Sequence, residues 1–163
     1  MAVDIFLKLD TVKGESLDSK HKDEIDVLSW SWGLSQSGTM HLGTGGGGGK
    51  VAVQDLTITK YTDRGTPSII SACATGKHFP TGKLTVRKAG GTKPLEYYTI
   101  ELEKIIVTNY ATGGSDAEDR FTETVTLNFE KFHVTYQQQD PSTGSAQGGV
   151  VESKWNIPAN ATA

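Results

Sequence analysis

Alternation between apolar and polar residues constrains the fold of this chain more than any other feature, because β-strand side chains point alternately to two faces. Residues 2–9 place Val3, Ile5, Leu7 and Leu9 on one face. Similar segments follow at residues 25–36, 51–61, 83–88, 95–108, 121–137 and 150–157, the last as an edge strand. The sequence therefore predicts a mainly β protein of about six to eight strands, arranged as a closed or nearly closed antiparallel barrel.

One short segment departs from the β pattern and predicts a helix. Thr66 suits the N-cap, Pro67 the first helical position and Gly76 the left-handed residue that ends a helix. Apolar residues recur between them at helical spacing: Ile69, Ile70, Ala72 and Cys73. A helix of roughly ten residues is too short to build a layer, so we expect it to cover the barrel. Cys73 is expected to be a buried, inert thiol.

Length and charge bound the function. The chain has 163 residues with no repeat or linker, so residues 1–163 are predicted to form a single domain. A net charge of −3 argues against nucleic-acid binding, and a single cysteine excludes an internal disulfide or a multi-cysteine zinc site. The N-terminus lacks the pattern of a Sec signal, and no apolar run reaches the length of a membrane span. We therefore expect cytosolic synthesis, no membrane insertion and, if the protein is secreted, export by another route.

The glycine-rich segment 37–50 matches the phosphate-binding pattern G-x-G-x-x-G at Gly43, Gly45 and Gly48. That pattern binds a pyrophosphate where a helix follows it, whereas β-alternation follows it here. Consecutive glycines lose much backbone entropy when they become ordered. We therefore interpret the segment as a flexible arm that gains order against a partner.

Residues that could support catalysis or bind a metal are scattered along the chain. The histidines form no HxH or HxxxH pair and are expected to be solvated or to lie in loops: His21, His41, His78 and His133. Several carboxylates are expected in solvated faces, turns or surface ion pairs: Glu101, Glu103, Glu118, Asp119 and Glu123. The sequence therefore predicts no catalytic, cofactor-binding or metal-ligating residue.

Two segments carry a polar stripe without charged residues. The first sets Leu28, Trp30, Trp32 and Leu34, predicted to face the core, against Ser29, Ser31, Gly33 and Ser35. The second sets Val125, Leu127 and Phe129 against Thr122, Thr124, Thr126 and Asn128. Exposed strands ordinarily carry Lys, Glu and Arg. The stripes therefore indicate a smooth polar wall that lies near another backbone or lines a wet channel.

Two breaks in the alternation predict irregular strands. The apolar positions of residues 121–137 change from odd to even numbers at residues 130 and 131, which predicts a β-bulge or a strong bend. Residues 105–107 are apolar on both faces, which indicates either a bulge or a subunit interface.

Short motifs along nearly the whole chain resemble the Hcp family, the haemolysin-coregulated proteins that form the inner tube of type VI secretion systems. The motifs are MAVD at residues 1–4, VKGES at 12–16, EIDVL at 24–28, WSWG at 30–33, QSG at 36–38, VQDL at 53–56, GKH at 76–78, LTVRKAG at 84–90, EDR at 118–120 and TVTLNF at 124–129. Their combination is specific, whereas no single motif would be.

The resemblance implies a β-barrel of two sheets with a short flanking helix. It implies that six copies form a ring with an open centre, and that rings stack into a tube inside a contractile sheath. The VgrG spike would cap this tube, and sheath contraction would expel the tube with its effector proteins. The chain would then be a non-enzymatic structural subunit that needs no cofactor and leaves the cell without a Sec signal.

The resemblance also assigns residues. Ser31 corresponds to a strand that the family turns toward the ring centre, so Ser29, Ser31 and Gly33 are expected to line the lumen and contact effectors. The arm at residues 39–50 and the turn at residues 89–92 are expected to contact neighbouring rings. The stacking residues are Gly43, Gly45, Gly46, Gly47, Gly48, Lys50, Gly90 and Gly91. Some relatives carry a C-terminal toxin domain, for which this chain leaves no room, so we expect it either to carry cargo non-covalently or to serve only as tube.

A small-molecule-binding β-barrel, such as a lipocalin-like carrier, is the alternative function. It would need an apolar cavity, whereas the Trp and Phe residues look sufficient to fill a core. A hydrolase is a third possibility, because a triad of distant residues escapes recognition in sequence.

Overall fold

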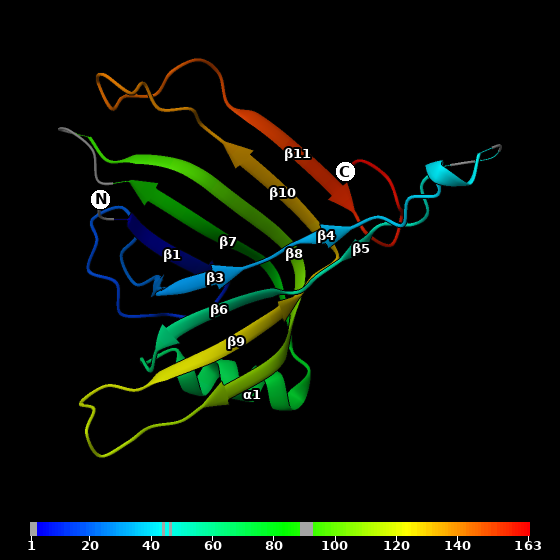
Figure 1. Ribbon diagram of the computed structural model, residues 1–163. Helices are drawn as coiled ribbons and strands as arrows, with labels where there is room; N and C mark the ends of the chain where they lie inside the picture. Colours follow the sequence, from blue (N-terminus) through cyan, green and yellow to red (C-terminus); the bar gives the residue numbers. More distant parts are fainter. Residues whose placement is uncertain (1–2, 44, 46, 89–92) are drawn as a thin grey trace.

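Antiparallel pairing carries the chain around a barrel in the computed structural model, which describes residues 3–43, 45, 47–88 and 93–163 (Figure 1). The strands are β1 (Val3–Leu9), β2 (Ile25–Asp26), β3 (Ser29–Ser31), β4 (Leu34–Ser35), β5 (Ala52–Val53), β6 (Leu56–Tyr61), β7 (His78–Lys88), β8 (Leu95–Thr112), β9 (Thr122–Asn128), β10 (Lys131–Tyr136) and β11 (Val151–Asn156). The helices are α1 (Thr66–Thr75) and the short 3₁₀ helix η1 (Met40–Leu42).

Two sheets share the long strand β8. The first half of β8 lies between β7 and β10, with β1 beyond β7 and β11 at the far edge. Its second half pairs with β9, followed by β6 and β3. Residues 25–31 close the barrel, because β2 pairs with β1 on one flank and β3 pairs with β6 on the other. The predicted two-sheet antiparallel barrel with one flanking helix is confirmed.

The bend in β8 explains the apolar run at residues 105–107. The buried residues change from even to odd numbers, from Ile100 and Leu102 to Ile105 and Val107. Between them Lys104 has a positive φ of 53°, and the register with β9 shifts after Val107. A bend therefore accounts for the broken alternation, because it turns the strand from one sheet into the other.

Residues 121–137 change partner where their alternation changes. β9 ends at Asn128 and β10 begins at Lys131, so the predicted bend is confirmed. β9 pairs with the second half of β8, whereas β10 pairs with the first half. The two strands therefore belong to different sheets.

The sequence predicts one strand over residues 25–36, whereas the structure has three short strands there, β2, β3 and β4. Ile25 and Val27 are buried, and then the inward side changes to Trp30 and Trp32. The prediction that Leu28 and Leu34 lie in the core beside the tryptophans is wrong, because both leucines are exposed, with fractions of 45% and 49%. The change of side follows from the change of pairing partner, from β1 to β6.

Helix α1 has the predicted length and end but a different first residue. Its N-cap is Gly65 rather than Thr66, whose Oγ1 instead accepts a hydrogen bond from the Asp63 N–H at 3.1 Å. Gly76 ends the helix in the left-handed conformation, and its N–H donates to the Ala72 carbonyl at 2.9 Å. Ile69 and Ala72 are buried against the barrel. Cys73 packs against the core but is only half-buried, so the expectation of a buried thiol holds only in part.

Apolar side chains from both sheets fill the barrel interior. The fully buried residues include Leu7, Ile58, Leu84, Ile100, Val125 and Leu127. Trp32 packs edge-on against Phe132 with ring centroids 4.9 Å apart, and Trp30 stacks on Tyr98 at 5.5 Å. These side chains occupy the space that a lipocalin-like carrier would need for its ligand.

A buried charge cluster holds the long loop of residues 10–24 against β1 and β7. Arg87 is buried, and its Nη2 donates to Asp4 at 2.9 Å and to Asp18 at 2.5 Å. The hydrogen bonds from Arg87 outweigh partial burial and, with the N–H groups of Lys20 and His21, hold the pKa of Asp18 well below its ordinary range. Ion pairs with Arg87 therefore hold the loop in place in addition to its backbone hydrogen bonds.

The low pKa of Asp18 makes stability depend on acid pH. A carboxyl group with a lower pKa in the folded chain stabilises the fold fully above its unfolded pKa, which is about 4, and that stabilisation is lost as pH falls further and passes through the lower folded pKa. We expect Asp18→Asn to lower the unfolding free energy at pH 7 and to lower it by a smaller amount at pH 2. Urea titrations at both pH values measure this, with the exposed Asp116→Asn as control. An equal difference at both pH values would contradict the assignment.

His21 lies in the loop of residues 10–24, one of the two placements expected for the histidines. It is buried there, with ring nitrogens 2.5 Å from a Glu24 oxygen and 2.6 Å from a Glu96 oxygen. Its ring also stacks on Phe6 with centroids 4.3 Å apart. Both ring nitrogens are therefore within hydrogen-bond distance of a carboxylate oxygen. His21 therefore connects the loop to the start of β8 rather than facing solvent.

Candidate functional site

The two predicted polar stripes come together on one outward face of the barrel. Register places Ser29 of β3 opposite Thr59 of β6, Thr59 opposite Thr124 of β9, and Thr124 opposite Ala111 of β8. A second row runs through Ser31, Thr57, Thr126 and Asn109. Residues directly opposite in antiparallel strands share a face. We call these eight residues the polar wall.

Hydrogen bonds between neighbouring strands order the polar wall and its margin. The hydroxyl oxygens of Thr57 and Thr126 are 3.3 Å apart. At the margin, Asp55 accepts hydrogen bonds from Asn128 Nδ2 at 2.8 Å and from the Thr108 hydroxyl at 3.0 Å. The eight residues of the wall carry no charge and present small hydroxyl, amide and methyl groups.

Gly33 does not lie in either row of the polar wall. It falls between β3 and β4, where its carbonyl accepts a hydrogen bond from the Gln54 N–H at 2.9 Å. An added Cβ at Gly33 would lie 3.3 Å from the Gln54 side-chain oxygen. Gly33 therefore belongs to the base of the arm, whereas Ser29 and Ser31 are exposed on the wall.

A buried ion pair lies directly behind the polar wall. Lys60 of β6 and Glu123 of β9 are in hydrogen-bond contact, and the side chains of both are fully buried. Lys60 Nζ also lies 3.1 Å from Asp63 and donates to the Tyr61 carbonyl at 3.0 Å. Thr66 at the start of α1 donates to Glu123 at 2.6 Å. The pair thus joins two strands of the wall to the helix.

The surroundings of this cluster shift the pKa values of Glu123 and Tyr110. Burial alone would raise the pKa of Glu123, but hydrogen bonds from Lys60, Thr66 and Tyr110 outweigh it and lower that pKa. The Tyr110 hydroxyl donates to Glu123 at 2.6 Å. Its burial and this hydrogen bond raise the pKa of Tyr110 to about 12. Glu123 therefore remains an ionised acceptor and Tyr110 a neutral donor.

Sequence reasoning placed Glu123 among solvated carboxylates, which is wrong. Glu123 is in phase with Val125 and Leu127, the alternate residues of β9 that are fully buried. Its position in the strand therefore already indicates an inward side chain. Lys60 likewise follows Leu56 and Ile58 on the inward side of β6. A charged residue in phase with the core indicates a buried partner, but its identity depends on which strands pair.

The outward face of the other sheet differs sharply from the polar wall, because it carries charges of both signs. One cross-strand row contains Lys8, Lys83, Glu101, His133 and Lys154. His133 contacts Glu101 at 3.2 Å and Glu152 at 2.7 Å. The barrel thus presents one uncharged and one charged surface.

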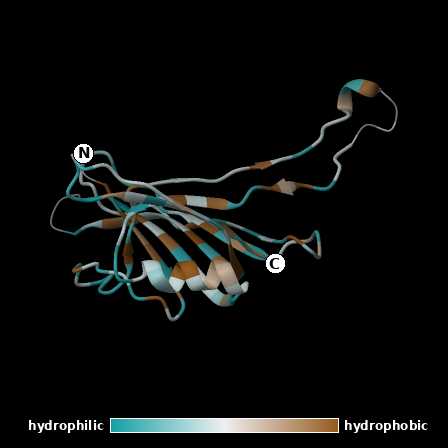
Figure 2. Ribbon diagram, turned by 90° about the horizontal axis from the view of Figure 1, so that it is seen from below, coloured by the Kyte–Doolittle hydropathy of each residue, from teal (hydrophilic) through white to brown (hydrophobic). Residues whose placement is uncertain are grey.

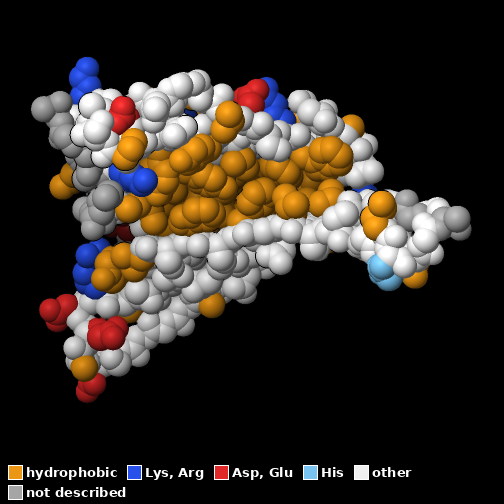
Figure 3. All heavy atoms as spheres, turned by 45° about the horizontal axis from the view of Figure 1, so that its top comes forward, with side chains coloured by type: hydrophobic (Ala, Val, Ile, Leu, Met, Phe, Trp, Pro, Cys, Tyr) orange, Lys and Arg blue, Asp and Glu red, His pale blue; other side chains and the backbone are white. Residues whose placement is uncertain are grey.

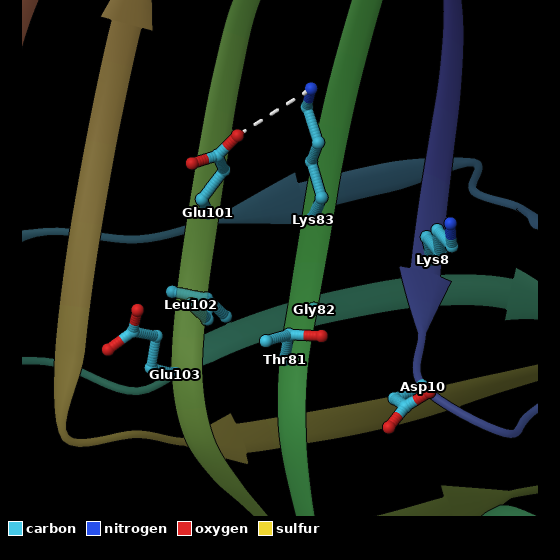
Figure 4. Close-up of a pocket in the computed structure, with 8 residues that line it drawn as sticks. All are labelled: Lys8, Asp10, Thr81, Gly82, Lys83, Glu101, Leu102 and Glu103. Carbon is cyan, nitrogen blue, oxygen red and sulfur yellow. Dashed lines mark ion pairs between the residues drawn. The ribbon is translucent and has the colours of Figure 1, made fainter.

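A shallow hollow of about 380 Å³ lies on this charged face (Figure 4). Strands β1, β7 and β8 line it with Lys8, Lys83, Glu101 and Glu103 among others, and Asp10 adds to the lining directly after β1. Figure 4 shows Lys83 reaching toward Glu101, and the two form an ion pair at 3.7 Å. Glu103, in the same lining, pairs with Lys131 at 3.5 Å, and no described nucleophile in the lining is hydrogen-bonded to a base.

The glycine-rich arm projects far from the barrel, as Figure 2 shows. Strands β4 and β5 pair at its base, and Thr39 near its tip exchanges two 3.0 Å hydrogen bonds with Gly47. Gly43 and Gly45 have φ values of 81° and 84°, which residues other than glycine rarely adopt. Because a strand follows the arm rather than a helix, the geometry of a phosphate-binding loop is not present. Gly46, Gly90 and Gly91 lie outside the described residues.

Two further properties concern the described part of the chain. Across residues 3–43, 45, 47–88 and 93–163, no three His, Cys, Asp or Glu side chains are grouped to hold a metal ion. Neither described helix has the length and apolarity that crossing a membrane requires.

Comparison with known proteins places this geometry in a family. Residues 6–136 match the family model described as "Type VI secretion system effector, Hcp". The Hcp1 protein of Pseudomonas aeruginosa is 56% identical over 163 residues, which is the whole of both chains.

Solved structures agree with this match. The crystal structure of Hcp1 from Salmonella typhimurium is 41% identical, covers both chains completely and has a TM-score of 0.82. A structure described as a type six secretion system protein is 33% identical, covers 99% of this chain and 100% of that chain, and has a TM-score of 0.91. This chain belongs to the Hcp family, the tube proteins of type VI secretion systems.

Proposed function

We propose that this protein is a non-enzymatic subunit of the secretion tube, in which six chains form a ring and the polar wall faces the central channel. The observation that carries the proposal is the polar wall itself, eight uncharged residues contributed by four strands. A channel through which proteins must slide favours a surface without fixed charges, because charged pairs would retain the cargo. The charged face of the barrel would then lie outward, toward the contractile sheath.

The arm has a separate role in this proposal. Rings would stack through the arm, using Gly43, Gly45, Gly47, Gly48 and Lys50, together with Gly46, Gly90 and Gly91. The VgrG spike would close one end of the stack, and effector proteins would travel non-covalently in the channel. Export by the type VI system would carry the protein out of the bacterial cytoplasm.

The first experiment measures the mass in solution by size exclusion with light scattering, followed by negative-stain imaging. A ring of six 17.5 kDa chains would have a mass of 105 kDa and an open centre. A monomer of 17.5 kDa at all concentrations would overturn the proposal.

A substitution in the polar wall tests the channel assignment. Ser31→Gln is expected to leave the ring mass unchanged and to reduce the amount of effector that copurifies with rings from secreting cells, because six bulkier side chains narrow the channel. Thr81→Gln adds similar bulk on the charged face and is the control. Quantitative mass spectrometry of purified rings gives the readout, and equal effector content in both variants would refute a luminal Ser31.

A further inference from the structure

The outward side of α1 is unusual for a surface helix, because it carries no charged residue. Its exposed residues are Pro67, Ser68, Ile70, Ser71, Ala74 and Thr75. Ile70 has an exposed fraction of 43%. The solvent face of a helix in a globular protein ordinarily carries charged and polar side chains. The composition of α1 is therefore typical of a helix that packs against protein on its outer side as well as on its inner side.

A second uncharged surface lies on the sheet formed by β8, β10 and β11. It is on the same face of that sheet as the buried residues Ile100 and Leu102. It consists of exposed or half-buried side chains, namely Leu28, Trp30, Tyr98, Val134, Tyr136 and Val151. Tyr98, Tyr136 and Val151 lie opposite one another across β8, β10 and β11, and Trp30 stacks on Tyr98. We call these six residues the open apolar face. Figure 3 shows a continuous hydrophobic band in this region of the molecule.

The two surfaces lie on opposite sides of the barrel. Figure 1 shows α1 below the sheet of β9 and β6, whereas β10 and β11 lie at the top. The view from below in Figure 2 has α1 in front, and the view with the top forward in Figure 3 shows the hydrophobic band. One chain therefore cannot cover its own open apolar face with its own helix.

We propose that α1 of one chain packs on the open apolar face of a second copy of the same chain, and that this contact builds the ring. This inference rests on the proposed ring. The surfaces are electrostatically matched, because burying uncharged residues of α1 against uncharged residues of the face removes no charge from water. A partner with charged side chains would leave those charges desolvated on the open apolar face.

The geometry is also compatible with a closed assembly. Two different surfaces on opposite sides of a chain make a head-to-tail contact, which continues from copy to copy and forms a ring where the rotation between copies closes, or an open filament where it does not. A contact between two copies of one surface would stop at a dimer. The placement of α1 opposite the open apolar face therefore fits a ring, whereas the polar wall remains free to face its centre.

A charged residue on α1 tests the contact. Ile70→Glu is expected to convert rings to 17.5 kDa monomers at concentrations where the unchanged chain is a ring, an effect of at least about tenfold on assembly. Leu17→Glu places the same charge on an exposed residue of the loop and should keep the rings intact. Because Ile70 is exposed in the monomer, thermal unfolding should show that the variant remains folded.

A crosslinking experiment tests the pairing of the two surfaces directly. In a Cys73→Ser background, chains carrying both Ile70→Cys and Tyr136→Cys are treated with a short bis-maleimide. We expect a denaturing gel to show a ladder from covalent dimers up to the full ring, and each single cysteine variant to give no dimer. Crosslinking by the Ile70→Cys variant alone would show that like surfaces meet, and would overturn the proposal.

The outcomes separate this inference from the proposed function. If the unchanged chain forms rings and Ile70→Glu also forms rings, the ring stands and the contact through α1 is wrong. If Leu17→Glu dissociates rings as strongly as Ile70→Glu does, the loss is not specific to α1 and the proposal is again overturned. If the unchanged chain is a monomer at every concentration, the proposed function fails together with this contact.

Discussion

Replacing Glu123 with alanine is expected to destabilise the chain by about 3–5 kcal/mol, because the substitution leaves the Lys60 ammonium buried without its partner. Lys60 and Glu123 are fully buried. The Tyr110 and Thr66 hydroxyl groups also lose their shared acceptor. Urea unfolding followed by tryptophan fluorescence, at one fixed chain concentration, measures the change.

A double substitution distinguishes the buried charge from simple loss of packing. Lys60→Met together with Glu123→Leu removes both charges and keeps apolar volume, so we expect it to be more stable than Glu123→Ala. Glu118 is exposed and provides the matched control, since Glu118→Ala should change stability by less than about 0.5 kcal/mol. A loss below about 1 kcal/mol for Glu123→Ala would show that the ion pair does not hold β6, β9 and α1 together.

Deleting residues 45–48 is expected to abolish long tubes while leaving rings of unchanged mass. The deletion removes Gly47 and Gly48, which pair with Thr39 and Gly38, so the arm loses the ladder that holds its tip. The barrel keeps its pairing, because β4 and β5 join at the base of the arm and form a separate two-stranded sheet. Electron microscopy of concentrated protein gives the distribution of tube lengths, and light scattering gives the ring mass.

Gly38→Ala is the control for this deletion, because Gly38 is not among the proposed stacking residues. An added Cβ at Gly38 meets nothing within 4 Å, and its φ is not positive, so the arm keeps its length and conformation. Tubes of this variant should be as long as those of the unchanged chain. Equally long tubes in the deletion variant would refute the stacking role of the arm, whereas loss of the rings would place the arm in ring formation instead.

Local patterns were sufficient where the cause of a structure lies within a few residues. Pro67 and Gly76 predicted α1 because a proline suits the first turn and a glycine suits the left-handed end. The change of alternation at residues 130 and 131 predicted the separation of β9 from β10. The absence of charge beside Ser31 and Thr126 likewise marked two strands with an unusual outward face.

Long-range pairing decided what these local patterns could not. Thr57 meets Thr126 across 69 positions of sequence, and only the pairing of β6 with β9 merges the two stripes into one polar wall. The same pairing brings Lys60 to Glu123 across 63 positions and reverses the expectation that this glutamate is solvated. His21 is buried for a similar reason, because Glu96 reaches it from 75 positions away.

The sequence by itself thus determined the strand-rich class, the helix and the uncharged stripes, because alternation and turn residues act on neighbouring side chains. The tertiary structure alone decided which stripes share a face, which charges are buried together and which apolar residues stay uncovered. Burial depends on the partner strand, and a strand of given alternation can place the same residue in a core or at an open edge.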